Sequence, residues 1–263
     1  MTLYPAVAQD SPEDVARALI AAEDSNNVDA AVAEFADDAV VTLPPPFGVL
    51  DTPDKIRAWQ QELADGHFRL EPMNIQADGN VVTWTGNVSF DPFRSLGIAS
   101  MSANWKLDIE DGKVKTFDFS FTPEALTALQ AGATAAALVG AEAANDVDAA
   151  VAQFAPDAVV TLADGSVFDT PEGVRGWQQV LADGHFRLEP VARYVEGNTV
   201  YMYGEVAWDT FRQLGLPTVG GMWTIVVVDG KVEKFDFSFT PAGAAAFQAA
   251  LAAMATPEAT ASS

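Results

Sequence analysis

The sequence has no cysteine, only two histidines and few basic residues. The absence of cysteine excludes disulfides, thiolate nucleophiles and cysteine metal sites. Lysine and arginine together number 14 against 37 aspartates and glutamates, which gives a formal net charge of −23. A surface this acidic repels phosphate backbones and anionic lipid headgroups. We therefore expect neither nucleic acid nor a membrane surface as a partner.

Long hydrophobic runs are also missing, since no apolar run approaches the roughly 20 residues that span a bilayer. Ala6-Val7-Ala8 has the small-x-small pattern of a signal-peptidase site. The five residues before it are too few for the apolar segment of about 7–15 residues that a signal peptide needs. The default expectation is a cytoplasmic protein, with an exported mature form as the alternative.

What the chain does have is an apolar fraction of 49% with 10% aromatics, enough for real cores, and an internal repeat. His67 and His185 are 118 residues apart, as are Asp118 and Asp236, whereas Phe35 and Phe154 are 119 apart. A period this long is a whole domain, because solenoid units run about 20–50 residues. The segments that recur are 27–35 as 146–154, 64–72 as 182–190, and 117–123 as 235–241.

The repeat predicts two domains with a boundary near Gly132, between the end of one helix and the start of the next. The expected organisation is an N-terminal extension over 1–11, a first repeat over 12–131, a second repeat over 132–256 and a flexible tail over 257–263. The change in spacing from 119 to 118 means that the second copy is one residue shorter between these points. The deletion falls near Pro44-Pro45-Pro46-Phe47, where the second copy reads Ala163-Asp164-Gly165.

Each copy begins with helices and ends with strands. Val28, Ala31, Val32 and Phe35 have helical spacing, and Thr52-Pro53 is a typical helix start. Apolar and polar residues then alternate from residue 82 to 90 and from 101 to 109, which predicts strands with one buried face. We expect Asp38 and Asp157 to precede the first strand of their copies in a turn or cap. The fold class is α+β, with helices packed in a curved antiparallel sheet.

The outward positions of the second copy's strands are unusually apolar, and burial against a neighbour would explain this. The residues concerned are Tyr201, Tyr203, Ala207, Met222, Val226 and Val228.

A helix running into "AVAQFAPDAVVTL", a Thr-Pro-capped second helix and strands ending in "DGKV…FDF" resemble the NTF2-like superfamily, in particular its SnoaL-like branch. The resemblance covers residues 12–131 and 133–255. It implies two tandem cone-shaped domains, each wrapping a pocket, and an internal pseudo-dimer of the two repeats, with further oligomerisation as an option. Enzymes of this superfamily, such as ketosteroid isomerases, polyketide cyclases and limonene-epoxide-hydrolase-like proteins, place acid–base carboxylates inside the cone.

Those carboxylates are not matched in this chain. Phe119 and Phe237 stand at the position of the last-strand catalytic Asp, while Asp118 and Asp236 are offset by one residue and face outward. Catalytic residues are therefore predicted to be absent, with His67, His185, Asp118 and Asp236 as the weak candidates. Each histidine is as well explained by a partly exposed strand start, and Arg69 with Glu71 or Asp91 with Arg94 by surface ion pairs. We expect no cofactor and no metal, because one histidine per copy has no carboxylate partner at ligand spacing.

The leading hypothesis is a non-enzymatic protein that binds a small apolar molecule in one or both cones. The alternatives are an isomerase or cyclase acting on a carbonyl compound, and a structural or assembly module. Filled and open cones are equally compatible with the sequence. The candidate ligand-binding residues are the inward-facing large side chains Trp59, Trp84, Trp105, Phe117, Phe119, Trp177, Met202, Trp208, Trp223, Phe235 and Phe237.

Overall fold

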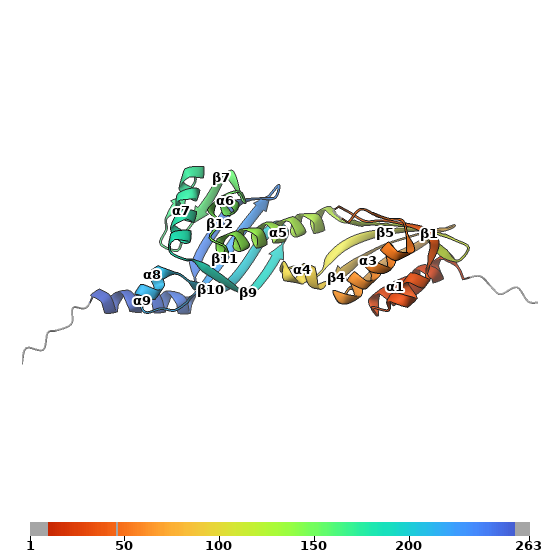
Figure 1. Cartoon of the computed structure of the whole chain (residues 1–263), viewed down its shortest axis with the longest axis horizontal. Helices are drawn as coiled ribbons and strands as arrows, with labels where there is room; N and C mark the ends of the chain where they lie inside the picture. Colours follow the sequence, from red (N-terminus) through yellow and green to blue (C-terminus); the bar gives the residue numbers. More distant parts are fainter. Residues whose placement is uncertain (1–9, 46, 256–263) are drawn as a thin grey trace, which may run out of the picture. The chain divides into compact units, whose positions relative to one another are not determined.

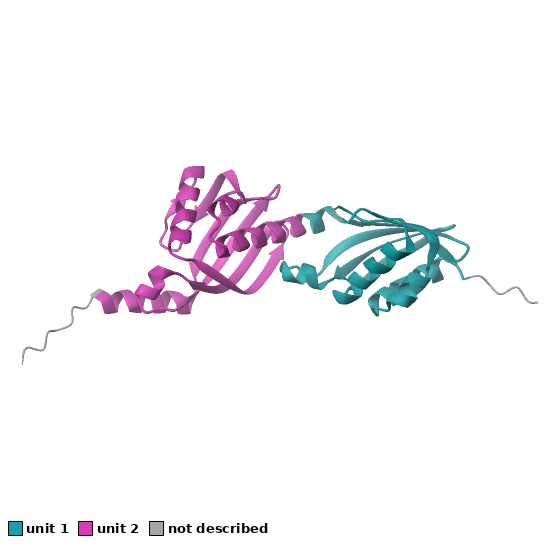
Figure 2. Cartoon of the chain, in the orientation of Figure 1, with its two compact units in different colours: residues 1–126 teal, residues 127–263 magenta. Residues whose placement is uncertain are grey.

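A computed structural model describes residues 10–45 and 47–255 of the chain. The chain divides into two compact units, residues 1–126 and 127–263, which we call the first and second repeat (Figure 2). The signal-like Ala6-Val7-Ala8 and the tail predicted for 257–263 lie outside the described residues.

The first repeat is α+β, with helices against one face of a six-stranded sheet (Figure 1). The strand order is β2-β1-β6-β5-β4-β3, and the sheet is mixed because β1 runs parallel to β6 while the other pairs are antiparallel. The elements are α1 (Pro12–Asp24), α2 (Val28–Ala33), β1 (Phe35–Thr42), β2 (Val49–Leu50), α3 (Pro53–Asp65), β3 (Arg69–Asp78), β4 (Val81–Ser89), α4 (Asp91–Ser95), β5 (Met101–Glu110) and β6 (Lys113–Phe121).

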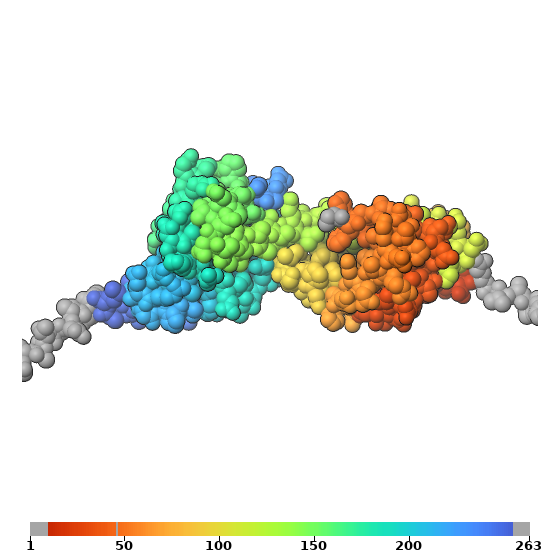
Figure 3. Space-filling model, viewed as in Figure 1, coloured from red at the N-terminus to blue at the C-terminus, as the bar shows by residue number. Residues whose placement is uncertain are grey.

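The second repeat has the same topology, with strand order β8-β7-β12-β11-β10-β9 and a parallel β12–β7 pair. Figure 3 shows the surface of the chain in the same view. The elements of the second repeat that follow α5 (Pro123–Ala143) are α6 (Val147–Val151), β7 (Phe154–Thr161), β8 (Val167–Phe168), α7 (Pro171–Asp183), β9 (Arg187–Glu196), β10 (Thr199–Ala207), α8 (Asp209–Gln213), β11 (Val219–Val228), β12 (Lys231–Phe239) and α9 (Pro241–Ala255).

The predicted break between two helices near Gly132 is wrong. One helix, α5 (Pro123–Ala143), is continuous through Gly132. By the repeat spacing, its first part corresponds to α9 and its last part to α1, so the closing helix of one copy is fused to the opening helix of the next. A glycine costs about 1 kcal/mol against alanine inside a helix, but the surrounding residues are rich in alanine, the best helix former.

The expected first strands begin earlier than predicted. Phe35 and Phe154 open β1 and β7 and are not the last residues of a helical stripe. Asp38 and Asp157 therefore lie within these strands and do not precede them. Lys115 on the neighbouring strand pairs with Asp38 and lowers its pKa, mainly through their hydrogen bond.

The strand faces are as the alternation predicted. In β4, Val82, Trp84 and Val88 are buried while Thr83 and Thr85 are exposed. The outward face of the second sheet carries Tyr194, Tyr201, Tyr203 and Met222, each at least 38% exposed. Ala207, Val226 and Val228 on the same face are half-buried. Burial of this face against a neighbour stays a prediction.

Candidate functional site

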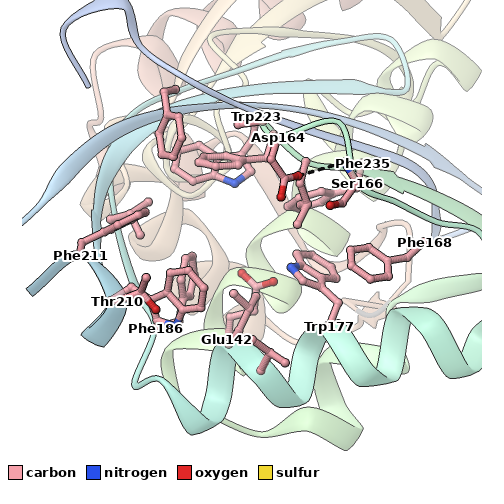
Figure 4. Close-up of a pocket in the computed structure, with 18 of the residues that line it drawn as sticks. Glu142, Asp164, Ser166, Phe168, Trp177, Phe186, Thr210, Phe211, Trp223 and Phe235 are labelled. Atoms are coloured by element: carbon pink, nitrogen blue, oxygen red, sulfur yellow. Dashed lines mark hydrogen bonds between the residues drawn. The ribbon is translucent and has the colours of Figure 1, made fainter. Parts of the chain in front are cut away.

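Each repeat has a cavity between its helices and the concave face of its sheet. The second repeat's cavity has a volume of about 520 Å³ (Figure 4). The corresponding space in the first repeat is about 70 Å³. Both possibilities left open by the sequence therefore occur, with a nearly filled cone in the first repeat and an open cone in the second.

Aromatic side chains make most of the wall of the larger cavity. They come from the sheet, from α7, α8 and α9, and from the residues next to β9 and β10. The ring centroids of Trp177 and Phe235 are 5.1 Å apart, as are those of Trp223 and Phe237, so the aromatic side chains of the wall pack against one another. The aromatic residues that line it are Phe168, Trp177, Phe186, Trp208, Phe211, Trp223, Phe235, Phe237, Phe239 and Phe247.

The cavity also has one buried carboxyl group, Glu142 of α5. Its side chain points into the cavity in Figure 4, with the indole nitrogen of Trp177 on the same side. Gln178 of α7 donates a hydrogen bond of 2.8 Å from Nε2 to Glu142 Oε1. Burial raises the pKa of Glu142 from 4.5 to about 7, and the Gln178 hydrogen bond acts in the opposite direction. A carboxyl group with a near-neutral pKa in an apolar cavity is typical of a functional site.

Sequence reasoning missed this group because it searched the inward faces of the strands. Those faces are apolar, but Glu142 comes from a helix. It lies on the buried stripe of α5 that contains Ala131, Ala135 and Leu138, the last of these one turn before it. The signal was present: a glutamate on the apolar face of α5, with a glutamine among the buried residues of α7.

The first repeat contains the same pair. Gln60 Nε2 donates to Glu23 Oε1 over 2.7 Å, both side chains are buried, and burial raises the pKa of Glu23 to about 7. Glu23 lines the smaller cavity. The pair therefore joins two helices in both repeats, and only in the second repeat does its glutamate also face a cavity large enough for a ligand.

Two buried positions behind the cavity walls differ between the repeats. In the first repeat, Trp84 stacks on Trp105 with ring centroids 5.5 Å apart and planes 8° apart. Met202 takes the place of Trp84 in the second repeat, so this stack is lost. Gly221 takes the place of Ala103, and a β-carbon there would lie 2.6 Å from Trp223 and 2.7 Å from Phe237. Without that carbon, both rings lie against the strand backbone.

The loop at the rim of the cavity differs as well. In the first repeat, Pro44 and Phe47 line the small cavity. The one-residue-shorter loop of the second repeat places Asp164 and Ser166 there, and the Ser166 amide donates to Asp164 Oδ1 over 2.9 Å (Figure 4). Hydrogen bonds from the Ser166 amide and hydroxyl lower the pKa of Asp164.

The candidate ligand-binding residues separate into two groups. Trp177, Trp208, Trp223, Phe235 and Phe237 line the large cavity. In the first repeat Trp59, Trp105, Phe117 and Phe119 line the small one. Trp84 and Met202 are buried but line neither cavity.

The weak catalytic candidates lie away from both cavities. His67 and His185 are 71% and 69% exposed, and Nδ1 of each is 2.7 Å from an Oδ2 atom, of Asp91 and of Asp209 respectively. Asp118 is exposed, and Asp236 pairs with Lys234 over 2.7 Å on the outer face of the sheet.

The two candidate ion pairs have different outcomes. Asp91 does pair with Arg94, at an exposed position. Arg69 instead donates to the backbone carbonyl of Asp24 over 2.7 Å.

In the part of the chain that the structure describes, no three His, Asp or Glu side chains come together in a way that could hold a metal ion. No helix within residues 10–45 and 47–255 is both long and apolar enough to cross a membrane.

Comparison with known proteins adds a family assignment to this geometry. The family model of the SnoaL-like domain matches the sequence twice, over residues 16–117 and 135–235. The chain belongs to this family. It is a tandem pair of SnoaL-like domains with the NTF2-like cone fold. No curated protein matches the sequence significantly.

Several solved structures resemble one SnoaL-like repeat. An NTF2-like protein of unknown function from Cytophaga hutchinsonii is 16% identical, with a TM-score of 0.38, over 45% of this chain and 96% of its own. An NTF2-like protein of unknown function from Burkholderia pseudomallei is 21% identical, with a TM-score of 0.38, over 43% and 92%. The epoxide hydrolase/cyclase-like enzyme SalBIII, described for pyran ring formation in salinomycin, is 17% identical, with a TM-score of 0.39, over 43% and 92%.

Proposed function

We propose that the second repeat binds a small, largely apolar molecule in its cavity. The observation that carries this proposal is the volume of about 520 Å³ behind an aromatic wall. Ligand pockets typically run about 300–1,000 Å³ and have mostly apolar walls with a few polar groups. The first repeat, at about 70 Å³, is too small for such a ligand. One binding site per chain is expected.

Fluorescence titration with the neutral apolar probe N-phenyl-1-naphthylamine tests this proposal. The blocking variant is Gly176→Leu, because Gly176 lines the cavity and a β-carbon there meets nothing within 4 Å. Leucine is also a better helix former than glycine, so the fold should be retained. The matched control is Ala58→Leu, at the equivalent position of α3 in the first repeat.

The proposal predicts one bound probe per chain, an affinity loss of about tenfold or more in Gly176→Leu, and no change in Ala58→Leu. Equal loss in both variants, or two equivalent sites per chain, would contradict it. Far-UV circular dichroism and the melting temperature check that both variants are folded.

Glu142 supports a second candidate function, proton transfer in a carbonyl compound, as in an isomerase or cyclase. A carboxylate near its pKa at neutral pH can remove a proton next to a carbonyl and return it to another carbon of the same molecule. The test is hydrogen–deuterium exchange at the carbon next to the carbonyl of a bound cyclic enone, followed by NMR. Enzyme-catalysed exchange should fall about 100-fold or more in Glu142→Gln, and no protein-dependent exchange in the native chain would exclude this candidate.

A further inference from the structure

The charge of the cavity wall has one sign. Among the described residues that line it, the ionisable side chains are Glu142 in the interior and Asp164 at the rim, and none is basic. The ordinary pKa of Asp164 is already acidic and its hydrogen bonds lower it further, so this group is ionised at neutral pH. The formal charge of the whole chain is −23. The electrostatic potential of such a site attracts cations and repels anions.

One carboxyl oxygen of Glu142, Oε2, is free to bind a ligand. Gln178 donates to Oε1, and no second hydrogen-bond partner for this carboxyl occurs among the described residues. Since the carboxyl points into the cavity (Figure 4), a ligand atom can reach Oε2. A donor or a positive charge on the ligand would satisfy it, and a ligand that is apolar throughout would leave it without a partner.

The walls around Glu142 also suit a positive charge. Trp177 and Phe186 lie on the same side of the cavity as Glu142 in Figure 4, and Trp223 and Phe235 lie opposite. The faces of aromatic rings attract ammonium groups, tryptophan most strongly, and the attraction grows where water is excluded. The cavity therefore offers a positive charge both a carboxylate and aromatic rings, whereas a neutral ligand would use only the rings.

We infer that the ligand of the second repeat is an organic amine, an apolar body with one ammonium group that binds Glu142 and the surrounding aromatic rings. This inference rests on the proposed function and specifies its ligand class. It differs from the carbonyl candidate in the charge state of Glu142. An ammonium group needs the ionised carboxylate, whereas a carbonyl oxygen would accept a hydrogen bond from the protonated one.

The two ligand classes therefore predict opposite pH dependence. Below the pKa of about 7, an ammonium ligand must displace the proton of Glu142, so its affinity should rise with pH up to about 7 and then level off. For a carbonyl ligand, affinity should be constant below about 7 and fall above it.

The other polar and charged groups near Glu142 do not mimic this titration. Gln178 of α7 does not titrate. Asp146 caps α6 through its bond to the Ala149 amide, Asp164 has a lowered pKa, and Arg187 at the start of β9 donates to the Ala143 carbonyl over 3.2 Å. The lowered pKa of Asp164 keeps that group ionised throughout the pH range in which Glu142 changes charge.

The test compares (2-naphthylmethyl)trimethylammonium with its neutral carbon isostere 2-neopentylnaphthalene. The ammonium is permanent, so the ligand itself does not titrate. Calorimetry or fluorescence titration from pH 5.5 to 8.5 should show the ammonium ligand binding about tenfold or more tightly at pH 7.5 than at pH 5.5. The isostere should bind more weakly, and its affinity should not rise with pH.

The variant Glu142→Gln should weaken ammonium binding about tenfold or more and remove its pH dependence, while leaving the isostere unaffected. Glu23→Gln is the matched control, because it breaks the same kind of buried pair in the first repeat. It should leave both ligands unaffected. Equal binding of the two ligands, or ammonium affinity that falls with pH, overturns the amine inference and leaves the proposed function standing. Binding of neither naphthyl ligand nor the apolar probe overturns both.

Discussion

The two repeats share their topology, their buried Glu–Gln pair and their phenylalanine-rich last strand, yet one has a cavity of about 70 Å³ and the other about 520 Å³. In the first repeat, Trp84 stacks on Trp105 behind the cavity wall. Met202 and Gly221 remove that stack and let Trp223 and Phe237 lie against the strand. The proposed explanation is that a few side chains on a constant framework decide whether a cone is a filled core or an open pocket.

The stacked Trp84 is the sharpest way to test that comparison. It is 2% exposed, so Trp84→Ala should lower the free energy of unfolding by about 3–5 kcal/mol, through lost burial and the cavity left behind. Chemical denaturation measures this change. The enlarged first cone should then accept a second molecule of apolar probe.

The matched variant Met202→Ala should be the milder of the two, since Met202 is not part of a ring stack. If Trp84→Ala creates no second probe site, the size of the first cavity is limited by something other than this ring.

The buried glutamates should give stability a pH dependence that the two repeats share. Burial raises the pKa of Glu23 and of Glu142 from 4.5 to about 7. Between these pH values the folded chain keeps protons that the unfolded chain releases, so the free energy of unfolding falls as pH rises through this window. The loss is on the order of 3 kcal/mol for each carboxyl group.

The measurement is urea denaturation from pH 4.5 to 8 for the native chain, Glu23→Gln, Glu142→Gln and the double variant. A plot of the free energy of unfolding against pH should be steepest for the native chain and flattest for the double variant. Each single substitution should remove about half of this difference in slope. A pH profile identical in all four proteins would mean that neither carboxyl is held protonated.

The sequence predicted the strand faces and the domain duplication well, because both produce periodic patterns in the sequence. Alternation placed Val82, Trp84 and Val88 inward and Asp118 outward, and the repeated segments gave the duplication. It did not predict the fusion of two helices through Gly132, since local propensity does not show where a domain ends. Nor did it predict the difference in cavity volume, which depends on how Trp223 and Phe237 pack over a missing β-carbon. Glu142 was missed for a different reason, because its signal lay in a helix and the search was confined to strands.

Substitution of Gly221 should have a smaller effect than substitution of Trp84, and it should lower ligand affinity. In Gly221→Ala the new carbon would lie 2.6 Å from Trp223, so both rings must move toward the cavity. Overpacking of this kind costs about 1–3 kcal/mol of stability, and ligand affinity should fall about tenfold as the cavity narrows. The reverse change in the first repeat, Ala103→Gly, should leave ligand affinity unchanged. If Gly221→Ala binds the probe normally, the wall relaxes outward and the account of the cavity size is wrong.

Substitution of the exposed histidines should have the smallest effect on stability, and the effect should be nearly the same in both repeats. His67 and His185 both have φ of 51° after a helix, a left-handed conformation common just past helix ends, and both contact an aspartate at 2.7 Å. Alanine at either position should change the melting temperature by no more than about 2 °C, and by the same amount in both repeats. Ligand affinity should not change in His185→Ala, because His185 does not line the cavity. A loss of binding in His185→Ala but not in His67→Ala would place the ligand at the mouth of the second cone, against its rim, and not in the aromatic interior beside Glu142.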